Sequence, residues 1–222
     1  MIDSKDSPTA KFDARISKIC MVIARLILAY MFFCQTFWKL PPTFGCGGSY
    51  VFPKPSTTAA YDVNNSGGLC FYMGLESISA SKPRQVLIAD MRPAGWPTIG
   101  VDISPIAKIN GYLLDNLFIP QIRIFGWLVY LLEFWVFVSL ALGLFTRLGA
   151  LAAIGISFQL YVGLANVGSE WEWTYGILLA LAIVMLGAAA GRTFGLDGWL
   201  RPRLAGPAGR GNRIAQFLLL LG

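Results

Sequence analysis

Residues 124–145 read IFGWLVYLLEFWVFVSLALGLF, an apolar run in which Glu133 is the one charged residue. Three more apolar runs of similar length stand at Ile19–Trp38, Leu148–Val167 and Trp173–Gly191. At about 1.5 Å of rise per residue, each run is long enough as a helix to cross a hydrocarbon core about 30 Å thick. The sequence therefore predicts an all-α membrane protein, a bundle of four transmembrane helices.

The charges are distributed around these runs. The chain of 222 residues is 55% hydrophobic and only 14% charged, which indicates one bundle plus loops, and its net charge is +6. Basic residues gather in residues 1–18, at Arg147 and in residues 192–222, whereas the link around Glu170 carries none. By the positive-inside bias we expect both tails to be cytoplasmic and the Glu170 link to be outside. The basic residues thus orient the chain in the bilayer, and no nucleic-acid partner is expected.

A long extracytoplasmic segment, residues 39–121, is predicted between the first two spans. It is rich in proline and glycine, with strand candidates at Leu69–Met73 and Gln85–Ala89. Near residues 105–118 apolar side chains recur at helical spacing, which predicts an amphipathic helix that lies on the outer leaflet or is buried in a folded cap. Cys46 and Cys70 lie on the oxidising side and are the expected disulfide. The remaining apolar stretch, Ile214–Leu221, is either an interfacial segment or the end of an incomplete chain.

Two ionisable residues fall inside the predicted spans, where a charge is expensive. Arg25 lies about 9 Å from the cytoplasmic end of its helix, and Glu133 lies about 14 Å from the outer end of its own. Arg25 is expected to snorkel to headgroups or to pair with Glu133. Gln159 lies about 16 Å above the cytoplasmic end of its helix, level with Glu133. A contact between Gln159 and Glu133 is therefore predicted.

Glu133 is the expected catalytic residue if the chain carries out chemistry. Desolvation favours the neutral form of a carboxyl, which can exchange a proton with a quinone or another lipophilic ligand. Gln159, Arg25 and Trp135 are the candidate ligand-binding residues, since the first two are polar within the membrane and the ring of Trp135 shields Glu133 from water. The alternative is that Glu133 and Gln159 only hold helices together.

A metal or haem cofactor is not expected from this chain. It contains no histidine, the commonest haem and metal ligand, and its four cysteines have no C-x-x-C spacing. A redox cofactor would therefore have to be shared with, or held by, a partner.

Several stretches together resemble the DoxX/DoxD family. They are Arg25-Leu26, Trp38–Leu40, Leu140–Arg147 (LALGLFTR), which follows Glu133, Trp171–Gly176 (WEWTYG) and Gly191–Leu200 (GRTFGLDGWL), with a looser match at residues 92–97 (RPAGWP). The stretch after the fourth span is similar to the DoxD branch, the membrane subunit of thiosulfate:quinone oxidoreductase.

The resemblance implies a four-helix protein of a prokaryotic inner membrane that passes electrons to quinone together with a partner subunit on the extracytoplasmic side. Quinone is then the expected redox partner. A second hypothesis is a non-catalytic accessory subunit of a larger respiratory or photosynthetic complex. The donor, the quinone type and the oligomeric state are left open.

Overall fold

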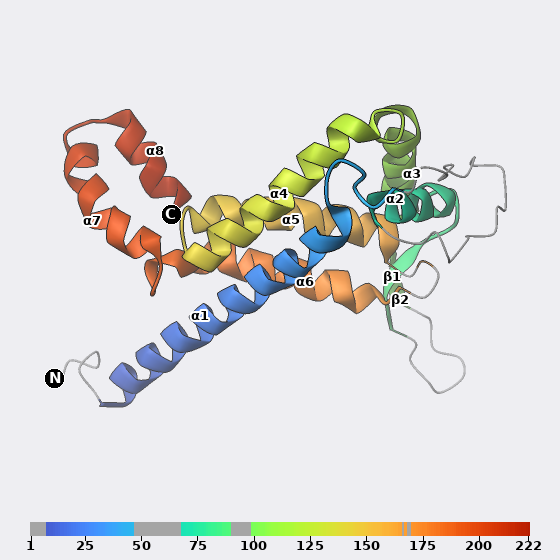
Figure 1. Ribbon diagram of the computed structural model, residues 1–222. Coiled ribbons are helices and arrows are strands. Elements are labelled where there is room, and N and C mark those ends of the chain that lie inside the picture. The colour runs from blue at the N-terminus through green and yellow to red at the C-terminus, as the bar shows by residue number, and fades with distance from the viewer. Residues whose placement is uncertain (1–7, 47–67, 90–98, 166, 168–169) are drawn as a thin grey trace. The chain divides into compact units, whose positions relative to one another are not determined.

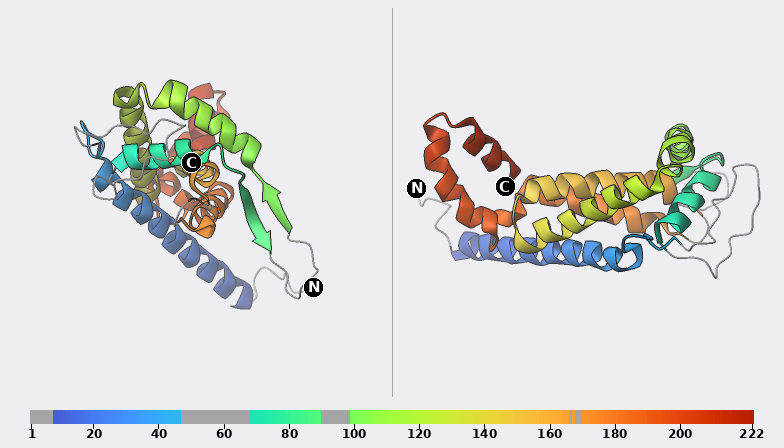
Figure 2. Two further views of the ribbon diagram at one scale, coloured as in Figure 1. Left: turned by 90° about the vertical axis from the view of Figure 1, so that its right-hand side faces the viewer. Right: turned by 45° about the horizontal axis from the view of Figure 1, so that its top comes forward.

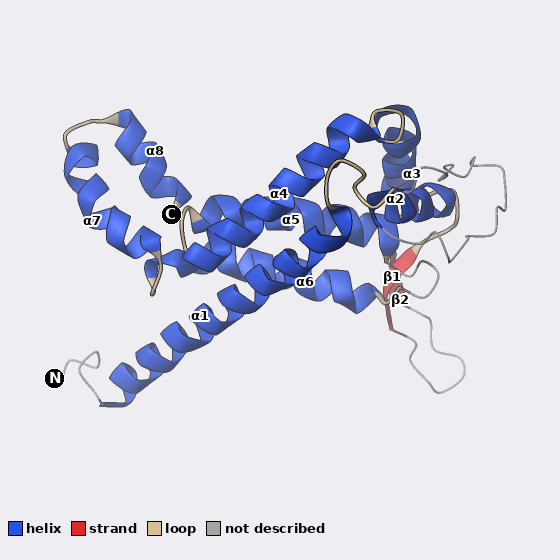
Figure 3. Ribbon diagram, viewed as in Figure 1, coloured by secondary structure: helices blue, strands red, loops and turns tan. Residues whose placement is uncertain are grey.

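The computed structural model describes residues 8–46, 68–89, 99–165, 167 and 170–222. The match at residues 92–97, and parts of the N-terminal tail and of the 39–121 segment, lie outside the described residues. Helices dominate, and one two-stranded antiparallel sheet of β1 (Gln85–Ala89) and β2 (Ile99–Asp102) accompanies them (Figures 2 and 3). The protein is an all-α membrane protein, with this one small sheet among the residues that the structure describes.

Three helical stretches are long and apolar enough to cross a membrane: Thr9–Lys39, Ile122–Leu142 and Thr146–Leu164. They correspond to α1 (Pro8–Thr36) with the 3-10 turn η2 (Phe37–Lys39), to α4 (Ile122–Leu142) and to α5 (Thr146–Leu164). A fourth apolar helix, α6 (Glu172–Ala188), has 17 residues and is shorter. Helix α1 begins at Pro8, inside the segment that the sequence indicated as a polar tail.

The chain divides into two compact units, and the boundary between them falls within α1, α4, α5 and α6. The first unit comprises residues 1–34, 133–154 and 180–222. Its buried side chains include Leu28, Val136, Leu140 and Met185. It also holds the turn η5 (Ala190–Arg192) and the helices α7 (Leu196–Gly209) and α8 (Arg213–Leu221) (Figure 1). The expected basic tail of residues 192–222 is therefore largely helical, although Pro202 and Pro207 lie inside α7.

The second unit comprises residues 35–132 and 155–179. It contains the small sheet, α2 (Gly68–Ser79), α3 (Ser104–Leu113) and a π-helical turn, η4 (Leu114–Phe118). One apolar cluster of this unit joins Phe44, Leu69, Met73 and Leu114, and a second joins Val86, Ile103 and Ala165.

The strand expected at Leu69–Met73 is wrong, because these residues form the first turns of α2. Leu69, Met73 and Glu76 are all buried and recur three or four residues apart, which is the period of one face of a helix. The strand expected at Gln85–Ala89 is confirmed as β1. A helix also begins at Ser104, with proline at its first turn, close to where the amphipathic pattern begins.

Candidate functional site

A carboxylate from α2 lies at the centre of a polar cluster in the second unit. Glu76 is only 3% exposed, although it follows the apolar residues Leu69 and Met73 on the same helix. Its side chain occupies the space beside Gly163 of α5, where a β-carbon would collide with the carboxylate. A glycine at position 163 is what allows a charged group to lie against this helix.

Two amide side chains donate hydrogen bonds to the same oxygen of Glu76. The Nε2 atom of Gln159 lies 2.6 Å from Oε2, and the Nδ2 atom of Asn110 lies 2.9 Å from it. Gln159 comes from α5 and Asn110 from α3, so the carboxylate joins three helices. Neutral amides stabilise the carboxylate by hydrogen bonding without cancelling its charge.

Two buried cations belong to the same cluster. Arg84 and Lys39 are 4% and 5% exposed. The Nη1 atom of Arg84 donates to the carbonyl oxygens of Val162 at 2.5 Å and Gly163 at 2.6 Å, and the ammonium of Lys39 lies 4.3 Å from the centre of the Trp38 ring. The buried Nη2 atom of Arg84 has no hydrogen-bond partner among the described residues. Buried donors of this kind are rare and call for an explanation.

The surroundings of Glu76 bring the pKa of its carboxyl close to neutral pH. Burial raises the pKa of Glu76 to about 7, although the amides of Asn110 and Gln159 and the charges of Arg84 and Lys39 act to lower it. Burial also lowers the pKa of Arg84, against the opposing effect of Glu76. We call Glu76, Gln159, Asn110, Arg84 and Lys39 the Glu76 cluster. It can bind an acceptor through a guanidinium donor and exchange a proton at neutral pH.

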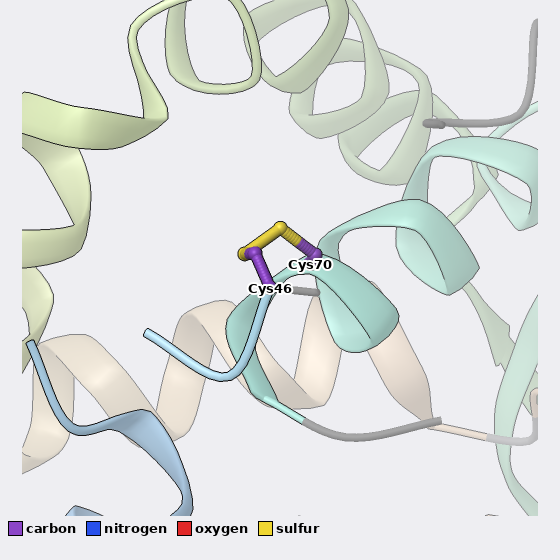
Figure 4. Close-up of a disulfide and its surroundings, with 2 residues drawn as sticks. All are labelled: Cys46 and Cys70. Carbon is purple, nitrogen blue, oxygen red and sulfur yellow. A yellow bond between two sulfur atoms is a disulfide. The ribbon is translucent and has the colours of Figure 1, made fainter. Parts of the chain in front are cut away.

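The expected disulfide between Cys46 and Cys70 is confirmed, with 5.4 Å between the two Cα atoms (Figure 4). Cys70 lies in the first turn of α2, on the helix that carries Glu76. The bridge therefore ties the chain after η2 to the start of that helix.

The four residues predicted for a ligand site divide between the two units. Gln159 belongs to the second unit, where its amide is bonded to Glu76, while Glu133, Arg25 and Trp135 belong to the first. Glu133 is buried and Trp135 is half-buried. Glu76 was not expected as a site residue, because a charge in a predicted extracytoplasmic segment carries no membrane penalty. The signal that would have found it is the helical spacing of Leu69, Met73 and Glu76.

Arg25 does not snorkel toward headgroups. Its guanidinium is buried and donates to three backbone carbonyls that follow α6: Nη1 to Ala190 at 3.0 Å and Thr193 at 3.3 Å, and Nη2 to Phe194 at 3.0 Å. The last carbonyls of a helix and the turn after it lack intrahelical partners, which makes them acceptors for a cation. Snorkelling was expected because Arg25 lies near the cytoplasmic end of its helix. The sequence does not show that backbone carbonyl acceptors lie at the same level.

Asp197 holds the same turn against the start of α5. Its Oδ1 atom accepts from the backbone nitrogen of Phe145 at 2.7 Å, and its Oδ2 atom accepts from the nitrogen and hydroxyl of Thr146 at 2.9 and 2.7 Å. The Thr146 hydroxyl in turn accepts from the nitrogen of Gly191 at 3.1 Å. The N–H groups of Phe145 and Thr146 are orphan donors at the N-terminus of α5, and a carboxylate satisfies them well.

Together with Arg25 these residues form what we call the Asp197 anchor. Gly143 and Gly195 leave room for the guanidinium, because a β-carbon at either position would lie within 2.6 Å of Nη1. The residues of the anchor come from Arg25-Leu26 and from the stretches 140–147 and 191–200, all of which carried the family resemblance. Their described contacts hold the fold together, so the most recognisable motifs of this chain are structural.

A metal centre is not apparent in the part of the chain that the structure describes, where no three His, Cys, Asp or Glu side chains form a group that would hold an ion.

The chain is similar to one family of known proteins. A family described as "TQO small subunit DoxD" matches residues 84–217, which is more than half of the chain. No curated protein and no solved structure matches significantly. The matched part includes the Asp197 anchor apart from Arg25 and, from the Glu76 cluster, Arg84, Asn110 and Gln159. The chain therefore belongs to the DoxD family.

Proposed function

We propose that this protein is the membrane subunit of a quinone-linked oxidoreductase of the thiosulfate:quinone type. The observation that carries the proposal is the Glu76 cluster, a buried carboxylate surrounded by amides and cations in a membrane protein of the DoxD family. A proton-exchanging group and a hydrogen-bond donor together are what a quinone site requires.

The residues of the Glu76 cluster fit a quinone. A quinone accepts electrons and protons in equal number, and its carbonyl oxygens accept hydrogen bonds. The Nη2 atom of Arg84 is a buried donor with no partner in the described chain, so it would bind such an oxygen. Glu76, with a pKa of about 7, is present near neutral pH both as a proton donor and as a proton acceptor. Phe71, Tyr72 and Trp38 supply aromatic surface in the same unit.

Glu133 stays a second proposal for the proton-exchanging residue, with Arg25, Gln159 and Trp135 as the ligand contacts that the sequence analysis named. Glu133 is buried within a largely apolar helix. The contacts of Gln159 with Glu76, and of Arg25 with backbone carbonyls, favour Glu76 over Glu133.

The topology that goes with this function has four crossings, with α6 as the fourth, in the inner membrane of a prokaryote. Both termini are cytoplasmic, and residues 39–121 are outside, where a partner subunit supplies electrons. The disulfide supports this placement because such bonds persist in oxidising compartments. A helix of 17 residues is at the short end of what spans a bilayer.

Thiosulfate-dependent reduction of a quinone analogue tests the proposal, in membranes from cells that make the full chain together with its partner subunit. Glu76→Gln should assemble normally and lose turnover at least tenfold, since an amide keeps hydrogen bonding but exchanges no proton. Glu133→Gln is the competing variant, and Asp13→Asn, an exposed carboxylate of α1, is the matched control.

The outcomes separate the hypotheses. Loss of turnover in Glu133→Gln alone would move the site to Glu133. Full turnover in both variants would remove the proton-exchange role. A wild-type chain that purifies with a large complex and shows no turnover would make it an accessory subunit.

A further inference from the structure

Helices α7 and α8 form a hairpin of defined structure (Figure 1). Asn212 caps α8, accepting from the backbone nitrogens of Ile214 at 3.0 Å and Ala215 at 3.1 Å. The side chain of Gln216 donates to the carbonyl of Ala208 at 3.1 Å, and Ala208 and Ala215 are both buried. The carboxylate of Asp197 ties the start of α7 to the start of α5. These bonds join the two helices of the hairpin to each other and join the start of α7 to the rest of the first unit.

Large apolar side chains are exposed on this hairpin. Phe194, just before α7, is 84% exposed, and Trp199 on α7 is 57% exposed. On α8, Ile214, Phe217 and Leu220 are 72%, 59% and 65% exposed and follow one another at intervals of three residues, so they share one side of the helix. An exposed apolar surface of this size is typical of a face that contacts a membrane or a protein.

The same hairpin is strongly basic. Residues 192–222 contain five arginines and one acidic residue, Asp197, for a net charge of +4. The carboxylate of Asp197 is buried against backbone N–H groups, whereas four of the arginines, Arg201, Arg203, Arg210 and Arg213, are exposed.

One of these arginines is paired with an aromatic ring. The guanidinium of Arg203 lies 3.4 Å from the centre of the Trp199 ring and also donates to the Trp199 carbonyl. Arginine and tryptophan placed together are favoured at the boundary between lipid and water.

The place of the hairpin in the chain identifies its partner. Helix α6 is apolar and ends at Ala188, and the hairpin begins at Leu196, so a short turn separates an apolar helix from a basic hairpin whose second helix, α8, is amphipathic. We propose that α7 and α8 lie in the headgroup region of the leaflet where α6 ends and bind anionic phospholipids. The arginines meet the lipid phosphates, and Trp199, Ile214, Phe217 and Leu220 enter the acyl boundary. This inference is independent of the quinone chemistry.

A fluorescent probe in the full chain tests the inference. Phe217→Cys, in a Cys20→Ser/Cys34→Ser background, is labelled with an environment-sensitive dye, and the protein is placed in nanodiscs of phosphatidylcholine alone or with up to about one-third phosphatidylglycerol. We expect a blue shift and quenching by a lipid-borne quencher that grow with the phosphatidylglycerol fraction and weaken at high salt.

Matched charge variants decide whether arginine recognises the anionic lipid. Each arginine near an anionic surface multiplies association roughly fivefold, so Arg201→Gln/Arg213→Gln should weaken docking roughly 25-fold. Lys82→Gln/Lys108→Gln removes the same charge from exposed sites in the second unit and should leave docking unchanged.

Three results would overturn the inference. They are quenching that is equal in both lipids, quenching that is unaffected by loss of the two arginines, and a dye that is shielded in detergent without phospholipid. The last would show that protein covers the hairpin.

Discussion

The Glu76 cluster and the Asp197 anchor are both buried and charged, but they bond to different partners. In the anchor, Asp197 and Arg25 bond mainly to backbone N–H and carbonyl groups at helix ends. In the cluster, Glu76 bonds to the side chains of Gln159 and Asn110, and one donor of Arg84 is left over.

Backbone partners keep their places as long as the helices do, so the anchor depends on the fold alone. Side-chain partners can move, and Glu76 can change its protonation state. The comparison teaches that the bonding partners of a buried charge, and not the depth of its burial, indicate whether it is structural or able to take part in chemistry.

Removing the anchor carboxylate should have the largest effect. Asp197→Ala leaves two backbone N–H groups and the Thr146 hydroxyl without their acceptor, which we expect to lower the free energy of unfolding by about 3–5 kcal/mol. Thermal unfolding followed by fluorescence size-exclusion chromatography in detergent measures the loss. Asp197→Asn keeps one acceptor and should lose less. An Asp197→Ala protein of wild-type stability would show that the anchor is not structural.

The pH dependence of stability should separate the two regions. Glu76 has a folded pKa of about 7 against an ordinary value of 4.5, so the folded protein holds this proton more tightly than the unfolded chain. Its contribution to the free energy of unfolding is thus fully present below about pH 4.5 and is lost as the pH rises through 7, a change of about 3 kcal/mol.

Glu76→Gln has no such proton. Its stability relative to wild type should therefore increase between about pH 5 and about pH 8. The melting temperatures of both proteins across this range provide the measurement. A difference that is constant with pH would mean that Glu76 does not titrate there.

The disulfide should support the Glu76 cluster and not the anchor. Cys46→Ser/Cys70→Ser removes a cross-link between residues 24 apart, and we expect a loss of about 3 kcal/mol from the chain-entropy argument. Cys20→Ser/Cys34→Ser breaks no bridge and is the control. Hydrogen exchange should rise in α2 and not in α7. An equal increase in hydrogen exchange in α2 and α7 would contradict the idea that the disulfide supports the Glu76 cluster alone.

The smallest effect is expected at Gly163. Gly163→Ala places a methyl group against the Glu76 carboxylate and should destabilise by about 1–2 kcal/mol. Gly155→Ala in the same helix meets no atom within 4 Å and should be neutral or stabilising by up to about 1 kcal/mol. A Glu76→Ala background should remove the penalty at position 163. If Gly163→Ala still lowers stability in the Glu76→Ala background, the loss comes from contacts other than the one with Glu76.

The helices were predictable to different degrees from the sequence. Hydropathy located α4 and α5 because a bilayer imposes length and apolarity on whatever crosses it. Hydropathy did not locate α2, because Leu69–Met73 is a short apolar run. Its helical period becomes visible only when the charged residue Glu76 is counted as a buried position. The hairpin of α7 and α8 was hidden by Pro202 and Pro207, which normally argue against a helix.

The candidate site was predictable only in part. Gln159 was singled out because it lies level with Glu133 in the membrane, whereas in the structure its amide is bonded to Glu76. The partner was not predictable, because Glu76 lies 83 residues away in a segment where charges are common. The cysteines were paired correctly because only two of the four lie outside the predicted spans.

The bridge between Cys46 and Cys70 has a consequence for the order of assembly. Both cysteines, and the helix that carries Glu76, precede α4 in the chain, so during synthesis they leave the ribosome before α5 does. With residues 39–121 outside, as proposed above, an oxidising compartment would cross-link α2 to the chain before it while Gln159 and Gly163 are still to be inserted. Helix α5 would then enter beside a helix that is already cross-linked, and its Gln159 and Gly163 would complete the surroundings of Glu76 last.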